Sequence, residues 1–283
     1  MNSNSERKNR QIYNKINIKK KCYVLIMSET ITEYESTPPA QPPQRENKQI
    51  FVIFCVPGRQ FSNKFLSCWN DVFSKMIYSG KYKVAFSNAY SSQVNFARAQ
   101  CLHCNVLDGP DQLPFKGKLD YDVMFWLDSD MVFNFEMVEH LILNCYHNFP
   151  VVSGLYALDG GQQLCCVENW DYEYYIKNGG FEFLTNEKRK ELLDSGNEWL
   201  KCAYTGMGCM AIRKGVLEDS RLKYPWFFSN IRRIDVIHPT IPYVTDGTSE
   251  DVSFIRNLIE NGIIDGVMVS LAAKFGHEKS IVY

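Results

Sequence analysis

Two aspartates separated by a single residue follow a strand-length apolar run in the middle of the chain. The run Val123–Leu127 is entirely apolar, and Asp128, Ser129 and Asp130 come directly after it. In open α/β sheets, ligands bind beyond the carboxyl ends of the strands. Alternation along an extended backbone would place the two carboxylates on one side, with Ser129 turned away. Because carboxylate oxygens suit Mn²⁺ or Mg²⁺, the segment predicts a cation site for a phosphate-linked substrate.

A second interpretation is that these acids only prepare the start of a helix. The spacing of apolar residues predicts a helix over 135–143, and Asn134 is its candidate N-cap. Asp130 lies too far before that helix to cap it. We therefore favour the metal site, although an isolated Asp-x-Asp is a common and unspecific pattern.

Glu250 and Asp251 form a second pair of acids, at the first turn of a helix predicted over 250–261. Acids at this end of a helix are favoured by its dipole, by ~0.3–1 kcal/mol. Ser249 is a candidate cap for the same turn. One acid would satisfy that structural role, so the other is a candidate functional carboxylate.

His277 and Arg98 are the remaining side chains with suitable chemistry, and each has a structural alternative. Imidazole can complete a carboxylate-bound Mn²⁺ site, but a single histidine is commonly a structural hydrogen-bonding residue. A guanidinium pairs with phosphate through two hydrogen bonds, but Arg98 could equally lie exposed on its helix.

The elements that must position these residues alternate between strand and helix. This alternation predicts an α/β fold whose central sheet is mainly parallel, with right-handed crossovers. The second half of the chain is mixed and carries an insertion over 170–201. The expected strands are 50–56, 82–87, 123–127, 151–156 and 208–212, and the further expected helices are 64–78, 95–107 and one starting over 213–218.

The composition indicates one folded domain over residues 49–283 after a disordered extension over 1–48. The chain has 283 residues and 45% hydrophobic content, enough for one substantial core. The extension is polar and includes a proline-rich stretch over 37–43.

Charge and cysteine content bound the class of protein. The 31 basic and 32 acidic residues leave a net charge of −1, so no global field favours nucleic acid. No apolar run has the length of a membrane helix or a signal-peptide core, so we expect no transmembrane segment and a cytoplasmic location. The ten cysteines are dispersed, and Cys55, Cys145 and Cys209 lie in apolar segments. We therefore expect reduced thiols buried as small hydrophobic residues.

Several short motifs occur in an order that resembles one enzyme family. They include Asn95–Arg98, Phe125–Asp130, Ser153–Tyr156, Thr205–Arg213, Tyr224–Phe228, Glu250–Phe254 and Gly276–His277. Together they resemble a GT-A-fold, nucleotide-sugar-dependent glycosyltransferase of the type often grouped as family 2, with a DxD motif. The resemblance spans residues 49 to 280 and implies a Rossmann-like three-layer sandwich with an elaborated, mixed C-terminal half.

The resemblance also implies roles for these residues. Asp130 would bind Mn²⁺ (or Mg²⁺) directly, Asp128 would contact the nucleotide ribose or the metal, and His277 would be a third metal ligand. The donor would be a sugar linked to a nucleoside diphosphate of the UDP or GDP type. The acceptor would be a glycan, a protein or a lipid-linked molecule.

In such a site Asp251 would be the general base, with Glu250 as the alternative, and a single displacement would invert the anomeric centre. The expected donor-binding residues are completed by Val56, Pro57, Arg59, Arg98, Ser129 and Gly206. Trp226 could stack on an acceptor sugar, although its apolar neighbours favour a place in the core.

Two other functional classes stay open. A metal-dependent nucleotidyl or phosphoryl transferase also uses clustered acids, but it would need further carboxylates or a basic phosphate loop. A catalytically inactive carbohydrate-binding protein of the same fold would not need all of the acids listed above.

Overall fold

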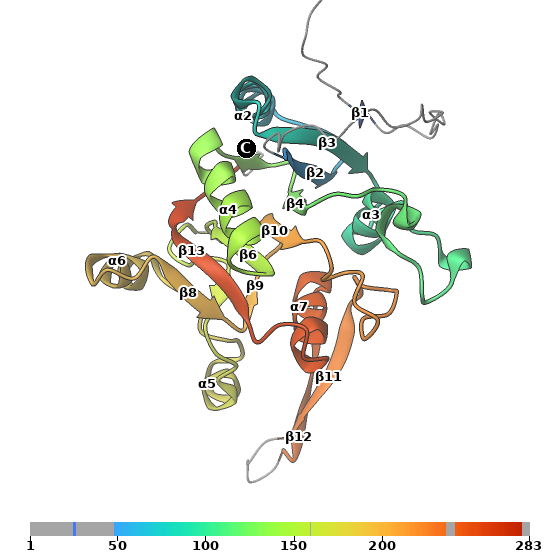
Figure 1. Cartoon of the computed structure of the whole chain (residues 1–283). Helices are drawn as coiled ribbons and strands as arrows, with labels where there is room; N and C mark the ends of the chain where they lie inside the picture. Colours follow the sequence, from blue (N-terminus) through green and yellow to red (C-terminus); the bar gives the residue numbers. More distant parts are fainter. Residues whose placement is uncertain (1–24, 27–47, 159, 236–240, 279–283) are drawn as a thin grey trace, which may run out of the picture.

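The computed structural model describes residues 25–26, 48–158, 160–235 and 241–278. Within these ranges an eight-stranded sheet forms the centre of the molecule, in the order β1-β3-β2-β4-β10-β6-β13-β8 (Figure 1). Its strands are β1 (Leu25–Ile26), β2 (Ile50–Pro57), β3 (Tyr82–Ala89), β4 (Val123–Leu127), β6 (Val151–Leu155), β8 (Trp199–Cys202), β10 (Cys209–Arg213) and β13 (Val267–Lys274).

Most of this sheet is parallel. The pairings β1–β3, β3–β2, β2–β4 and β6–β13 are parallel, whereas β10 runs against both of its neighbours and β8 runs against β13. The expected fold class is therefore confirmed: an α/β protein with a mainly parallel sheet in its first half and a mixed second half. The strand β4, which carries the predicted site, lies at the boundary between the two halves.

The helices cover both faces of the sheet. The connections β2-α2-β3 and β3-α3-β4 run in opposite directions across the sheet, so right-handed crossovers put α2 and α3 on opposite faces. Helix α4 packs against α2. The helices are α2 (Asn63–Ser79), α3 (Val94–Cys101), α4 (Phe135–His147), α5 (Tyr172–Asn178), α6 (Asn186–Asp194) and α7 (Glu250–Glu260).

Three small sheets and two 3₁₀ helices complete the described structure. The pair β11 (Asn230–Asp235) and β12 (Tyr243–Thr248) forms a hairpin next to α7 (Figure 1). The other elements are β5 (Met131–Val132) with β14 (Gly276–His277), β7 (Cys166–Val167) with β9 (Tyr204–Thr205), and the 3₁₀ helices at Val106–Asp108 and Pro114–Gly117.

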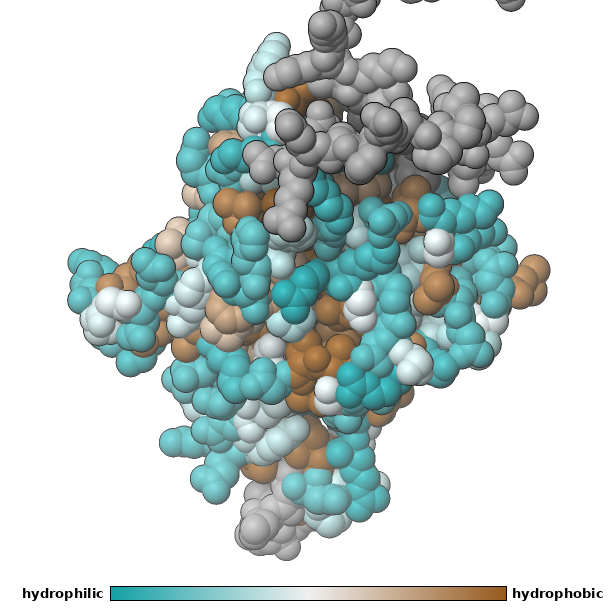
Figure 2. Space-filling model, in the orientation of Figure 1, coloured by the Kyte–Doolittle hydropathy of each residue, from teal (hydrophilic) through white to brown (hydrophobic). Residues whose placement is uncertain are grey.

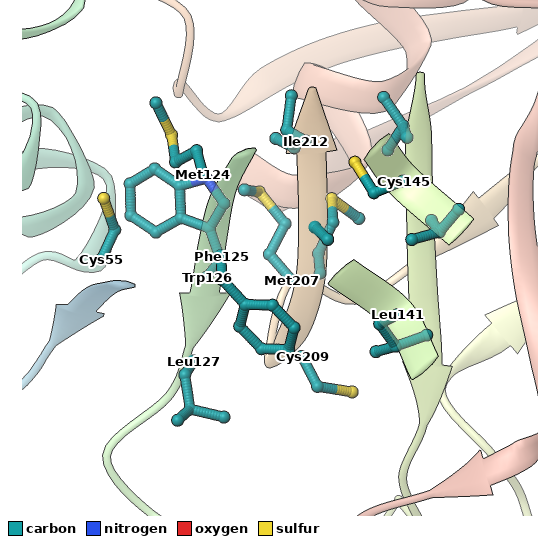
Figure 3. Packing of buried hydrophobic residues seen from close by; sticks show 14 of the residues in the cluster. Cys55, Met124, Phe125, Trp126, Leu127, Leu141, Cys145, Met207, Cys209 and Ile212 are labelled. Atoms are coloured by element: carbon teal, nitrogen blue, oxygen red, sulfur yellow. The ribbon is translucent and has the colours of Figure 1, made fainter. Parts of the chain in front are cut away.

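Strand β4 is buried on both faces, and this fixes the direction of its side chains. Phe125 packs against Phe54, which contacts Trp69 of α2, whereas Trp126 points to the opposite face and contacts Phe227. Figure 3 shows this strand beside β10, with Leu141 and Cys145 of α4 directed at the sheet. A five-residue strand with no exposed position holds its carboxyl end firmly, which a precise site requires.

The predicted core residues are confirmed. Cys55, Cys145 and Cys209 are fully buried free thiols, and Trp226 is 1% exposed. Trp226 therefore belongs to the core and has no free face for an acceptor sugar. The apolar stripe of α7 also belongs to the core, where Phe254 packs on Phe227.

Two predicted helices differ from the structure. The helix expected over 95–107 ends at Cys101, because His103 adopts a positive φ of 57° and Asn105 caps a separate 3₁₀ turn. The helix expected from Arg213 does not form, because Gly215, with φ of 98°, turns the chain and its amide donates to the Glu218 carboxylate. In both places local turn chemistry outweighs the helical spacing of apolar residues.

The segment expected to be disordered lies almost entirely outside the described residues, so that expectation stays a prediction. Leu25 and Ile26 within it form β1, which pairs with Ala85 and Phe86 of β3. Among the described helices, none combines the length and apolar character needed to cross a bilayer. The cytoplasmic location stays a prediction.

Candidate functional site

A buried arginine joins the strand β4 to two helices at its carboxyl end. Asp128 has the same parity as Trp126 and therefore lies on the face covered by α3. Arg98 of α3 places Nη2 3.3 Å from Asp128 Oδ1, and its Nε donates to Glu250 Oε1 of α7 at 3.1 Å. Arg98 is 3% exposed and also lies over the Trp126 ring. Of the two alternatives for Arg98, the exposed helix arginine is therefore wrong, and a contact with phosphate stays a prediction.

The charges of this cluster compensate one another. Burial alone would lower the pKa of Arg98, but the neighbouring carboxylates of Asp128 and Glu250 raise it above its usual value. Burial raises the pKa of Asp128 and of Glu250, and the Arg98 cation opposes that rise. Arg98 Nη1 has no hydrogen-bond partner among the described residues. One guanidinium donor is therefore left for another group.

Asp130 and His277, 147 positions apart in sequence, meet at the same end of the sheet. The pairing of β14 with β5 sets His277 opposite Met131 and brings its Nε2 to 3.1 Å from Asp130 Oδ2. His277 Nδ1 lies 3.2 Å from the carbonyl of Ala157, which can only accept, so Nδ1 carries a proton. In the neutral imidazole, Nε2 then presents a lone pair to a carboxylate, an arrangement that requires a proton or a cation between them.

The Asp130–His277 pair fits two neighbouring ligands of one divalent cation. Ligands at about 2.1 Å in adjacent octahedral positions lie about 3 Å apart, which matches the distance between Oδ2 and Nε2. The bond from Nδ1 to a carbonyl is the usual outer-shell contact of a metal-binding histidine. Among the described residues, no three His, Cys, Asp or Glu side chains converge as a complete metal site. The other positions would therefore belong to water and phosphate, as is usual for Mg²⁺.

The backbone through the Asp-x-Asp segment differs from the expected extended form. The strand ends at Leu127, and the chain turns so that the Met131 amide donates to the Asp128 carbonyl at 3.1 Å. The two carboxylates consequently have different partners, Arg98 for Asp128 and His277 for Asp130. A direct role of Asp128 as a metal ligand stays a prediction.

Asp251, unlike the adjacent Glu250, forms no ion pair among the described residues. Its Oδ2 accepts from the Tyr204 hydroxyl at 3.3 Å, and its Oδ1 accepts from the Ser249 hydroxyl and the Val252 amide. Ser249 thus bonds to Asp251 and does not cap the helix with its side chain, contrary to our expectation. Because Glu250 is held by Arg98, Asp251 is the better placed of the two to take a proton.

The loop after β2 packs against the Asp-x-Asp segment. Val56 and Pro57 are buried at the end of that strand, and Arg59 is exposed and lies over the Tyr90 ring. A Cβ on Gly58 would lie 2.4 Å from Ser129 Oγ, so only glycine allows this contact. Gly58 thus brings this loop against Ser129, and contacts of Val56, Pro57, Arg59 and Ser129 with a nucleotide stay a prediction.

Gly206 is required by a neighbouring side chain. A Cβ at this position would lie 1.9 Å from the Tyr156 hydroxyl oxygen, and Tyr156 in turn packs edge-on against His277 at 5.2 Å between ring centroids. Our sequence interpretation made Gly206 a donor-binding residue. The structure supplies a different reason for the glycine, and contact with a donor stays a prediction.

A cavity of about 220 Å³ lies beside Asp251, between the insertion and α7. Its walls include the half-buried aromatic rings of Trp170, Phe181 and Phe183, the buried ring of Tyr204, and Arg256. In the orientation of Figure 1, the hairpin β11–β12 and α7 lie to the right of β9 and α5 lies below it. The space-filling view of this side shows a group of hydrophobic residues near the centre of a mostly hydrophilic face (Figure 2).

Sequence reasoning missed Arg256 and Tyr204 as site residues. Arg256 lies one helical turn after Val252, on the buried face of α7, where an apolar residue is expected. A charged residue within an apolar helical stripe was the available signal. Tyr204 carried no such signal, because its contact with Asp251 joins elements 47 positions apart.

Comparisons with known proteins give little beyond the fold. The sequence matches no protein-family model and no curated protein. It is similar to the crystal structure of A197 from STIV, with 17% identity, 83% of this chain and 97% of that chain covered, and a TM-score of 0.41. It is also similar to a glycosyltransferase involved in the glycosylation of the major capsid of PBCV-1, with 10% identity, coverage of 82% and 96%, and a TM-score of 0.33. At these TM-scores neither similarity carries an argument about function.

Proposed function

We propose that this protein is a metal-dependent glycosyltransferase that moves a sugar from a nucleoside-diphosphate donor to an acceptor hydroxyl, with inversion. The observation that carries the proposal is the approach of His277 Nε2 to Asp130 Oδ2 at the carboxyl end of β4. Two cation ligands beside the loop after β2 suit a diphosphate, which supplies the remaining oxygen ligands. The order of motifs in the sequence, which resembles GT-A enzymes, supports the same conclusion.

Each side chain of the site has a role that its contacts allow. Asp130 and His277 would hold Mn²⁺ (or Mg²⁺), which when bound stabilises negative charge on the departing nucleoside diphosphate. Arg98 holds Asp128 in place and keeps one donor, Nη1, without a protein partner. That donor is available for a phosphate or ribose oxygen of the donor substrate.

Asp251 is proposed as the general base. It would take the proton of the acceptor hydroxyl while that oxygen bonds to the anomeric carbon, and the bond from that carbon to the diphosphate oxygen breaks. The electron pair of the broken bond leaves with the nucleoside diphosphate. The Tyr204 hydroxyl orients the carboxylate by donating to its Oδ2.

The first test is nucleotide binding by the full chain, measured by calorimetry with UDP and GDP, in Mn²⁺ and in EDTA. We expect one of the two nucleotides to bind in Mn²⁺ and to lose most of its affinity in EDTA. Asp130→Ala should abolish the metal-dependent part of binding. Asp120→Ala is the matched control, because Asp120 precedes the same strand but lies exposed in an ion pair with Lys214.

The result that would overturn the proposal is metal-independent binding, or equal binding by the wild type and Asp130→Ala. A transfer assay on nucleotide-sugar pools then identifies the chemistry. Release of the nucleoside diphosphate supports sugar transfer. Release of a sugar phosphate, the leaving group when the nucleoside monophosphate moiety of a nucleotide sugar is transferred, supports a nucleotidyl transferase and excludes this proposal.

A further inference from the structure

The cavity beside Asp251 has the size and walls of a site for one sugar ring. Its volume is about 220 Å³, below the roughly 300–1,000 Å³ of pockets that hold larger ligands. Trp170 and Tyr204 are stacked with an interplanar angle of 27°, and Phe181 meets Trp170 edge-on. Aromatic rings of this kind bind the apolar faces of sugars while hydroxyl groups remain at the edges.

Arg256 gives this cavity an unusual charge. Its side chain is 5% exposed, and its guanidinium lies 3.9 Å above the Trp170 ring. The Nη2 atom donates to the Tyr172 hydroxyl at 3.4 Å, and Nε has no partner among the described residues. A buried cation held by a ring and a hydroxyl keeps the capacity to bind an anion.

The acids near Arg256 are directed to other partners. Glu260 pairs with Arg232 at 2.7 Å, and Asp246, which also lines the cavity, lies near the Tyr175 hydroxyl and raises its pKa to about 12. Within the described part of the chain, no carboxylate forms an ion pair with Arg256. Burial of an unpaired charge is unfavourable, and such charges in folded proteins are normally paired. The missing partner is therefore expected to come from a ligand.

We propose that this cavity binds the acceptor, and that the acceptor is a sugar bearing an anionic group, a carboxylate or a phosphate, which pairs with Arg256. The proposal rests on the glycosyltransferase function proposed above. Tyr204 connects the two sites, because it lines the cavity and donates to Asp251. A sugar ring held against these aromatic side chains by its anionic group would present a hydroxyl toward the candidate base.

The test compares matched sugars by calorimetry and ligand-observed NMR on the full-length protein. The probes are methyl glucuronide, glucose 6-phosphate and methyl glucoside, which carry a carboxylate, a phosphate and no charge. We expect at least one anionic sugar to bind at least about tenfold more tightly than the neutral one. The two anionic probes distinguish a uronic acid from a sugar phosphate.

Two arginine variants locate the effect. Arg256→Gln should remove the preference for the anionic sugar, and Arg256→Lys should keep part of it. Arg232→Gln is the matched control, because Arg232 lies beside the same helix but already has Glu260 as its partner. The wild-type comparison of charged and neutral sugars does not depend on the folding of any variant.

Three results would overturn the proposal: equal binding of charged and neutral sugars, no binding of any of the sugars, or a charge preference that persists in Arg256→Gln. The nucleotide titrations separate this proposal from the proposed function. If a nucleotide binds in a metal-dependent way but charged and neutral sugars bind equally, only the proposal of an anionic acceptor is contradicted, and the proposed function stands. Anionic sugar binding without any nucleotide binding contradicts the transferase and leaves a carbohydrate-binding site.

Discussion

Two arginines are buried among the residues that the structure describes, and they lie in opposite electrostatic surroundings. Arg98 is 3% exposed and contacts the carboxylates of Asp128 and Glu250. Arg256 is 5% exposed and, within the described structure, contacts an aromatic ring and a hydroxyl but no acid. The first is an arginine paired with two acids, with only Nη1 left without a partner among the described residues, whereas the second has no acidic partner among them.

The difference shows how burial alone misleads as a guide to function. A buried arginine with two carboxylates fixes the positions of its neighbours, so it contributes to the structure of a ligand site as well as to any contact with the ligand. A buried arginine without a carboxylate is unfavourable for the fold and is retained more readily where it serves binding. The surroundings of the two arginines are two regions of the molecule, and the adjacent acids Glu250 and Asp251 lie on the boundary between them. Glu250 contacts Arg98, and Asp251 contacts Tyr204 at the edge of the cavity that Arg256 lines.

The largest effect is expected when the ion pairs of Arg98 are removed. Arg98→Met leaves two carboxylates buried without their cation, and loss of one partner from a buried ion network costs about 3–5 kcal/mol. We expect the free energy of unfolding in urea at pH 7 to fall by that amount. A decrease below about 1 kcal/mol would mean that the network contributes little to the fold.

The same variant should show a characteristic pH dependence. Burial already raises the pKa of Glu250 and of Asp128 in the wild type, and removal of Arg98 raises both further. A carboxyl whose pKa is higher in the folded state stabilises the fold below its unfolded pKa, near 4, and that contribution is lost as pH rises. The deficit of Arg98→Met should therefore be smaller at pH 4.5 than at pH 7. A deficit that grows on acidification would contradict this account.

The next effect concerns the boundary between the two regions. Asp251→Asn preserves the shape of the side chain but removes its basicity, so we expect transfer to fall about a hundredfold or more while nucleotide binding is unchanged. Transfer and calorimetric binding assays on the same preparation measure both quantities. Full activity in Asp251→Asn would remove this residue from the role of base.

Glu250→Gln is the matched variant on the other side of that boundary. Glutamine keeps a hydrogen-bond acceptor for Arg98 but removes one compensating charge, so its main effect should be on stability. A loss of activity in Glu250→Gln equal to that in Asp251→Asn would contradict the division in which Glu250 serves stability through Arg98 and Asp251 serves transfer.

Removal of the unpaired arginine should cost much less than removal of the paired one. Arg256→Met deletes a buried charge without leaving a carboxylate behind, and it loses a cation–π contact worth about 0.5–2 kcal/mol. The relief of an unpaired buried charge offsets that loss, so we expect a change in unfolding free energy within about 1 kcal/mol of zero. Urea unfolding in the absence of sugars measures it. A loss equal to that of Arg98→Met would show that Arg256 has a structural partner.

The fold was predictable from the sequence where the apolar pattern within one segment is enough to identify a strand or a helix. The apolar run ending at Leu127 and the helix over 250–261 agree with β4 and α7 to within a residue. Errors occurred where a turn competes with helical spacing. His103, with positive φ, ends α3 early, and Gly215 replaces a predicted helix by a turn. Single-residue backbone preferences of this kind are weak signals in a sequence.

The candidate site was predictable only in part, because its contacts join distant segments. The types and order of Asp130 and His277 indicated a cation site, and the structure brings them together. The partner of Arg98 was not predictable, because Glu250 lies 152 positions away and reaches it only through a tertiary contact. That no described acid forms an ion pair with Arg256 is also a tertiary property, since Asp251 and Glu260 flank it on its own helix.

An exposed pair gives the smallest expected effect and completes the comparison. Arg221 contacts Asp219 at 2.7 Å, closer than either contact of Arg98, yet the Arg221 side chain is 52% exposed. The hydrogen bonds from Arg221 lower the pKa of Asp219 from 3.8 to about 2. Any stabilisation from the pair is therefore present above pH 3.8 and is lost as the pH falls from 3.8 through about 2. Solvent screens such pairs, so Asp219→Asn should unfold within error of the wild type at pH 7. An NMR titration should find Asp219 still mostly ionised at pH 3; half-protonation near 3.8 would mean that the pair does not form in solution.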